Sequence, residues 1–155
     1  MLSRTIKVDG IPKAQPRPRA FARKMGGKFT ARVYDAATAE GWKSIVVAAA
    51  RGQRPDEPLD CALAVRLRFE LPRPKSRCRK RDPTDALFCT TKPDVDNLAK
   101  AVLDALTQDG WWTDDSRIVD IAVSKYWHAK GGRPGCTIEV VELPGINELQ
   151  TKAAG

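Results

Sequence analysis

Residues 92–119 of the chain read KPDVDNLAKAVLDALTQDGWWTDDSRIV. Pro93 disfavours a helical conformation at the residue before it, so a helix start is expected just beyond this proline. Apolar residues then recur at helical spacing, which predicts an amphipathic helix over residues 95–107. Gly110 ends that pattern, and an extended segment leads from it to Asp114 and Asp115.

The same stretch concentrates acidic side chains in a protein whose net charge is +8. Asp94 and Asp96 stand at the predicted helix start, and Asp115 follows the helix. The helix rises about 16 Å and the eight residues after Thr107 can span about 26 Å, so the chain can return Asp115 to the helix start. Carboxylates gathered there would repel one another unless a cation lay among them. Oxygen ligands without nearby His or Cys favour Mg²⁺, with Mn²⁺ able to replace it.

These acidic residues also have a simpler interpretation. Carboxylates in a first helical turn favour the helix dipole, and the pattern from Asp94 to Asn97 is a plausible cap. Two aspartates before a strand are common turn residues. Lys100 lies one helical turn after Asp96, where it could hold that carboxylate or stabilise charge on a phosphate. Spacing alone therefore leaves a metal site and a structural role both open.

The segments KPDVDNLAKAVLDAL and DDSRIVD within this stretch resemble the signature of the RusA family of Holliday junction resolvases. Matched position by position, the resemblance implies that Asp94, Asp96 and Asp115 bind the metal. It implies that Lys100 is the essential catalytic lysine. Asp114 makes the third ligand ambiguous, because neighbouring residues of an extended segment point to opposite sides. The motif leaves the role of the remaining aspartate of the helix, Asp104, undetermined.

The family resemblance further implies a Mg²⁺-dependent endonuclease that resolves four-way DNA junctions by paired, symmetric nicks in recombination and repair. It implies a homodimer acting on branched DNA in the cytoplasm, encoded by a bacterium or a prophage. Two equivalent subunits suit two equivalent cuts on a nearly two-fold substrate. Two alternatives remain open. A less selective magnesium nuclease could cut flaps or RNA with the same carboxylates, and a non-catalytic basic DNA-binding protein would use them only structurally.

Charge and composition indicate a polyanionic partner independently of the motif. The chain has 27 Lys and Arg residues against 19 Asp and Glu, and many of the acids are in the quoted stretch. A high net charge can also serve solubility alone. No apolar run approaches the roughly twenty residues that a membrane helix needs, so a membrane partner is not expected. The four cysteines form no CxxC pair and are interpreted as reduced thiols.

Two basic segments are the candidate DNA contacts. Residues 13–32 carry seven cations and no acid, and Gly26-Gly27 predicts a hairpin turn there. Residues 72–92 form a proline-punctuated loop that leads to the carboxylates, which predicts a flexible basic arm that orders on DNA. Phe88 in this loop is a candidate stacking residue, although burial beside Leu87 is the more ordinary interpretation. The DNA-binding candidates are Arg17, Arg19, Arg73, Lys75, Arg77 and Lys92.

The remaining periodicities predict one α+β domain over residues 1–143 and a polar tail over residues 144–155. Alternating apolar residues predict strands near residues 4–10, 61–71, 118–127 and 136–141. A further helix over residues 36–51 would be capped by Asp35 and would bury Trp42, Ile45, Val46 and Ala49. We expect a mixed or antiparallel sheet that both helices cover on one face.

Overall fold

Alternation of apolar and polar residues builds a five-stranded mixed sheet with the strand order β1-β7-β4-β6-β5. The computed structural model describes residues 2–16, 19–25, 28–34 and 39–145. β4 runs parallel to β6, and the other neighbouring strands are antiparallel. The strands are β1 (Ser3–Asp9), β4 (Leu63–Leu71), β5 (Leu87–Phe88), β6 (Ile118–Trp127) and β7 (Gly135–Glu142). The predicted α+β domain with a mixed sheet is confirmed.

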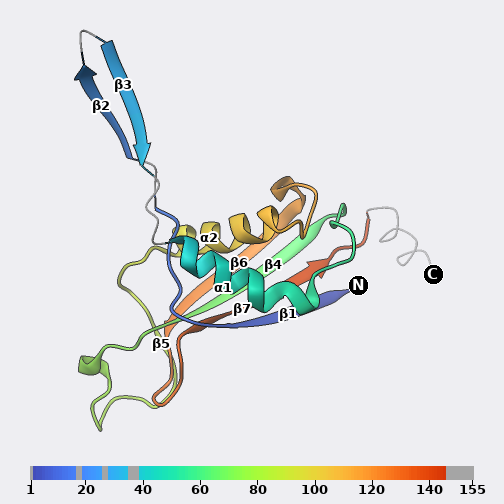
Figure 1. Ribbon diagram of the computed structural model, residues 1–155. Coiled ribbons are helices and arrows are strands. Elements are labelled where there is room, and N and C mark those ends of the chain that lie inside the picture. The colour runs from blue at the N-terminus through green and yellow to red at the C-terminus, as the bar shows by residue number, and fades with distance from the viewer. Residues whose placement is uncertain (1, 17–18, 26–27, 35–38, 146–155) are drawn as a thin grey trace, which may run out of the picture.

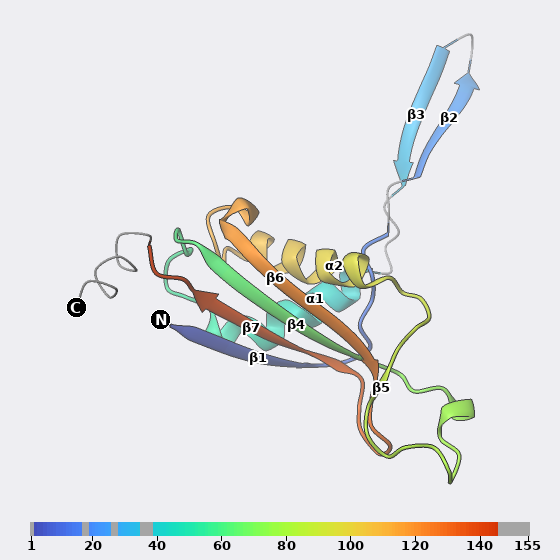
Figure 2. The same cartoon turned by 180° about the vertical axis from the view of Figure 1, so that it is seen from behind.

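Two helices cover one face of this sheet, as Figures 1 and 2 show from opposite sides. They are α1 (Glu40–Ala50) and α2 (Val95–Gln108). β4 shows the physical reason, because its apolar side chains Leu63, Val65, Leu67 and Phe69 are buried while Arg66 and Arg68 point to the open face. The prediction that both helices lie on the same face is confirmed. None of the described helices is long and apolar enough to cross a bilayer.

α1 begins later than the sequence predicts. Its first helical residue is Glu40 and its N-cap is Ala39, while the predicted cap Asp35 lies outside the described residues. Trp42 and Val46 are buried, but Ile45 is 42% exposed, so its placement in the core was wrong. Successive helical residues are about 100° apart around the axis, and the sheet covers the side of Val46 rather than that of Ile45.

α2 and the segment after it match the predicted pattern and add a long-range anchor. Six of its residues are buried in the core shared with the sheet and α1: Leu98, Ala99, Ala101, Val102, Ala105 and Leu106. Trp111 and Trp112, which follow the helix, are also buried. The Leu59 N–H donates to the Trp111 carbonyl at 3.0 Å, and the Thr113 N–H donates to the Leu59 carbonyl at 3.0 Å. These contacts fix the chain at the C-terminal end of α2.

The first basic segment forms a hairpin, as predicted. β2 (Arg19–Met25) pairs with β3 (Lys28–Tyr34) in a separate antiparallel sheet, which projects from the rest of the chain in Figures 1 and 2. The partners Met25 and Lys28 enclose the expected turn at Gly26-Gly27, which itself lies outside the described residues.

The second basic segment is more regular than the predicted flexible arm. It contains a 3₁₀ turn, η3 (Lys75–Arg77), and the short strand β5. Arg73 is 7% exposed, and its guanidinium donates to the carbonyls of Arg77 at 2.7 Å, Pro83 at 2.7 Å and Asp85 at 2.9 Å. Lys130 fastens the loop to the end of β6 by donating to the carbonyls of Arg79 at 2.6 Å and Asp82 at 2.7 Å. Internal hydrogen bonds therefore order this loop without DNA.

Candidate active site

The start of α2 exposes the first pair of predicted site residues. Asp94 is the N-cap, with an extended backbone, and its carboxylate makes no capping hydrogen bond. Asp94 and Asp96 are both exposed. The capping interpretation, which was the main structural alternative for Asp94, therefore does not describe its side chain.

Lys125 of β6 fastens the segment that leads into α2. Its ammonium donates to the carbonyl of Thr91 at 2.6 Å and to that of Pro93 at 2.8 Å. Sequence reasoning missed this residue. The signal was a lysine in the alternating stripe that also contains Ile121, Val123 and Trp127, where an inward-facing cation needs acceptors.

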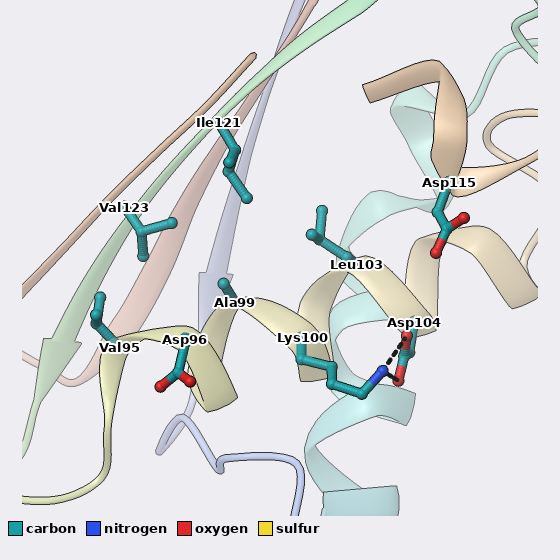
Figure 3. A pocket seen from close by; sticks show the side chains of 9 residues that line it. All are labelled: Val95, Asp96, Ala99, Lys100, Leu103, Asp104, Asp115, Ile121 and Val123. Carbon is teal, nitrogen blue, oxygen red and sulfur yellow. Dashed lines mark hydrogen bonds and ion pairs between the residues drawn. The ribbon is translucent and has the colours of Figure 1, made fainter. Parts of the chain in front are cut away.

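A pocket of about 410 Å³ lies between α2 and β6. Figure 3 shows its polar side chains, which are Asp96, Lys100, Asp104 and Asp115. Apolar side chains from both elements complete its lining: Val95, Ala99, Leu103, Ile121 and Val123. Three of the four predicted catalytic residues thus share one pocket, and Asp94 is not part of its lining.

Lys100 is held at the pocket by its neighbour one turn further along the helix. Its ammonium lies 3.3 Å from a carboxylate oxygen of Asp104, and its side chain remains 60% exposed. An i,i+4 pair of this kind stabilises a helix by a few tenths of a kcal/mol, about 0.2–0.5. In the free chain Asp104 therefore pairs with Lys100.

The two neighbouring aspartates before β6 have different surroundings. Asp114 accepts a hydrogen bond from the Ser116 N–H at 2.8 Å and so caps the turn η4 (Asp115–Arg117). The hydrogen bonds from Ser116 lower the pKa of the Asp114 carboxyl. Asp115, and not Asp114, lines the pocket.

The return of Asp115 to the start of α2, which the length of the connecting segment permits, does not occur. Figure 3 places Asp115 beside the second half of the helix, near Asp104, while Asp96 lies at the helix start. From Asp96 to Asp104 the helix rises about 12 Å. The buried Trp111 and Trp112 explain the difference. They hold residues 109–114 at the C-terminal end of α2, so β6 begins there and the segment does not extend back along the helix.

The donor atoms of the pocket fit magnesium in kind. They are carboxylate oxygens, and no His or Cys lines the pocket. Within the described residues, however, no three His, Cys, Asp or Glu side chains form a group that could hold a metal ion. Mg²⁺ is commonly held by one or two carboxylates together with waters and substrate phosphates. Asp96 and Asp115 can each serve in that way at opposite ends of the pocket, and the set of three ligands stays a prediction.

The predicted DNA contacts fall into three groups. Arg17 lies outside the described residues, as does the side chain of Arg19. Lys75, Arg77 and Lys92 are exposed. Arg73 is corrected, because its guanidinium is buried among loop carbonyls and braces the loop instead of facing solvent.

Comparisons with known proteins give one consistent result. A family model described as "Endodeoxyribonuclease RusA" matches residues 9–141. "Uncharacterized protein YqaN" of Bacillus subtilis (strain 168) is 36% identical over 125 residues, which cover 77% of this chain and 84% of that protein. "Crossover junction endodeoxyribonuclease rusA" of Enterobacteria phage 82 is 34% identical over 107 residues, 69% of this chain and 76% of that protein. "Crossover junction endodeoxyribonuclease RusA" of Escherichia coli (strain K12) is 40% identical over 77 residues, 50% of this chain and 52% of that protein.

Proposed function

The chain belongs to the RusA family, and from this premise we propose that it is a metal-dependent endodeoxyribonuclease that resolves four-way DNA junctions. One observation carries the proposal. Asp96, Lys100 and Asp115, which the family resemblance implies are functional, all line the pocket between α2 and β6, and this supports the proposal. Carboxylates beside a lysine are suited to a phosphodiester, which needs both metal ligands and a positive charge to balance its own.

Each side chain of the site has a proposed part in the reaction. Asp94 and Asp96 at the start of α2, and Asp115 nearer its other end, would supply carboxylate ligands to Mg²⁺, or to Mn²⁺ in its place. When bound, the metal would polarise the scissile phosphate and lower the pKa of an attacking water. The exposed Lys100 would leave its half-buried partner Asp104 and stabilise the negative charge that develops on the phosphate. The apolar floor of the pocket would limit competing water and strengthen these interactions.

Basic elements near the start of α2 support a DNA substrate. In Figure 1 the hairpin β2–β3 and the loop over residues 72–92 both extend from the end of the molecule where α2 begins. The loop exposes several cations around η3: Lys75, Arg77, Arg79, Lys80 and Arg81. Such side chains bind phosphates in a salt-dependent way and position a duplex without reading its sequence.

We include a homodimer in the proposal, and the free edge of β6 is the surface that supports it. On the side away from β4, β5 pairs only with Tyr126 and Trp127, so within the described residues Ile118–Ser124 have no strand partner there. Val119 is 64% exposed and Ile121 is 45% exposed along this edge, beside the pocket. A second copy of β6 could pair antiparallel with it, bury these side chains and present two sites to two strands.

The test is cleavage of an end-labelled synthetic four-way junction with and without Mg²⁺, with gel-shift binding measured on the same samples. Wild type should make paired, metal-dependent nicks, and Asp96→Asn should bind the junction without cutting it. Asp56→Asn is the matched control, because Asp56 is exposed and does not line the pocket. Wild-type cutting by Asp96→Asn would refute the site. If the wild type binds the junction but does not cut it in Mg²⁺ or Mn²⁺, a non-catalytic DNA-binding protein is favoured instead. If it cuts flaps or RNA as fast as the junction, a less selective nuclease is favoured.

A further inference from the structure

A row of planar groups crosses three neighbouring strands on the sheet face opposite the helices. The guanidinium carbon of Arg68 in β4 lies 4.0 Å from the ring centroid of Tyr126 in β6. The Tyr126 ring in turn stacks with Phe88 in β5, with centroids 5.1 Å apart and planes inclined by 26°. Because β6 lies between β4 and β5, Tyr126 is the middle member and Phe88 is the end of the row.

The outer end of this row is open to solvent. Phe88 is 73% exposed, which contradicts the more ordinary expectation that it would be buried beside Leu87. Its backbone is nevertheless fixed, because Phe88 pairs with Tyr126 and the next residue, Cys89, is buried and donates its N–H to the Lys125 carbonyl at 3.2 Å. The chain therefore presents an exposed aromatic ring that is stacked on Tyr126 on one side and held by backbone pairing.

The charge around this surface is mainly positive, although Arg68 itself is ion-paired with Glu70 at 3.3 Å. The loop that precedes β5 exposes five cations between residues 75 and 81, and two acids, Asp82 and Asp85, follow them. Hydrogen bonds from Lys130 hold this loop against the end of β6, and the Arg77 guanidinium lies 5.6 Å from the Trp127 ring centroid. A nucleic acid fits this surface, because its bases can stack on the Phe88 ring while its phosphates contact the cations of the loop.

We propose that Phe88, supported by Tyr126 and Arg68, is a stacking site for an unpaired nucleobase of the bound DNA. The inference rests on the proposed function for its substrate, because unpaired or loosely stacked bases occur where the arms of a branched DNA meet. Bases stack on exposed aromatic rings with little dependence on sequence, while cations beside them contact the backbone. The site lies on the sheet face opposite the helices and so differs from the pocket that α2 helps to form.

The row also has a purely structural explanation. Directly opposed aromatic side chains stabilise antiparallel pairs, and β5 has only two residues. That explanation predicts a lower unfolding temperature when Phe88 is shortened, and it predicts no contact with a base. Contact with the base must therefore be measured directly.

The first experiment is photo-crosslinking of the full chain to single-stranded DNA and to a four-way junction, each carrying 5-iodouracil, which reacts with aromatic side chains stacked on it. In the junction the 5-iodouracil is placed at the crossover. Crosslinks should map to the peptide that contains Phe88. If the crosslinks on both probes map only to other peptides, the proposal is overturned, even if substitutions of Phe88 weaken DNA binding.

The second experiment measures DNA affinity against salt concentration for Phe88→Leu, Phe88→Trp and the control Ile45→Ala, which changes an exposed apolar residue on α1. Phe88→Leu should weaken binding to single-stranded DNA about tenfold, within the roughly 5- to 150-fold that one stacked base is worth. Phe88→Trp should restore the affinity. The slope of log affinity against log salt should stay constant, because no phosphate contact is lost. Unchanged affinity of Phe88→Leu, or equal weakening by Phe88→Trp, would reject the stacking site.

Cleavage measured in the same samples separates this inference from the proposed function. Paired cutting by wild type without a crosslink at Phe88 would refute the stacking site alone. A crosslink at Phe88 without any cutting would refute the nuclease and keep the base-binding site.

Discussion

Lys125→Met should lower both the stability of the chain and its cutting rate, although Lys125 is not predicted to touch the metal or the phosphate. The ammonium donates two hydrogen bonds to backbone carbonyls just before Asp94, at 2.6 and 2.8 Å. Hydrogen bonds that involve a charged group are worth about 1.5–3 kcal/mol each. Because water can reach these acceptors once the lysine is removed, we take the lower end for the pair, about 3 kcal/mol.

This magnitude fixes the expected observations. A loss of about 3 kcal/mol should lower the unfolding midpoint of a chain of this size by about 6–12 °C. The single-turnover cutting rate at saturating Mg²⁺ and DNA should fall further, because a displacement of about 1 Å at a reacting group can cost 10²-fold. Lys7→Met is the matched control, since Lys7 is an exposed lysine on β1.

Two results would refute the reasoning about Lys125. An unchanged midpoint would mean that the two hydrogen bonds contribute nothing measurable. A lowered midpoint with wild-type cutting, measured below the midpoint of the variant, would mean that Lys125 supports the fold and does not position Asp94. Junction affinity should stay close to that of Lys7→Met, so that a lost phosphate contact is not mistaken for lost positioning.

Three other predictions concern separate parts of the chain. Asp115→Asn should abolish cutting, while Asp114→Asn should keep it. Because the pKa of Asp114 is lowered in the fold, its carboxylate should stabilise the fold fully above the usual pKa of 3.8, and this stabilisation should disappear as the pH falls through the folded pKa. Urea unfolding curves of wild type and Asp114→Asn should therefore converge in acid. Iodoacetamide should label exposed Cys78 in the native chain and Cys136 only after unfolding, since Cys136 is buried and burial raises the pKa of its thiol; mass spectrometry showing native labelling of Cys136 would contradict the fold there. Val119→Lys should give a monomer by light scattering and lose paired nicking, whereas a dimer of unchanged affinity would remove the β6 edge from the interface.

The sequence predicts what depends on local spacing. α2, the strand alternation and the basic hairpin follow from periodicity and turn residues, and the structure confirms them. The position of Asp115 does not follow, because the hydrogen bonds of Leu59 that hold the preceding segment come from a residue more than fifty positions earlier. The predicted DNA contact of Arg73 is wrong for a similar reason. The carbonyls that accept its hydrogen bonds lie up to twelve residues further along a loop whose path the sequence does not define.

The pocket is fastened at both ends, and this limits how its carboxylates can meet. Lys125 holds the start of α2 to β6, and the buried Trp111 and Trp112 hold the end of the helix where β6 begins. Moving Asp115 along α2 toward Asp96 would expose those indole rings, and burying a large aromatic side chain is worth several kcal/mol, about 3–5 by truncation. A metal held by Asp96 or by Asp115, as proposed, would therefore complete its coordination with groups that one chain does not place there, such as waters, a DNA phosphate or a second copy of the chain. For that reason we expect tight metal binding to accompany substrate binding and assembly rather than to precede them.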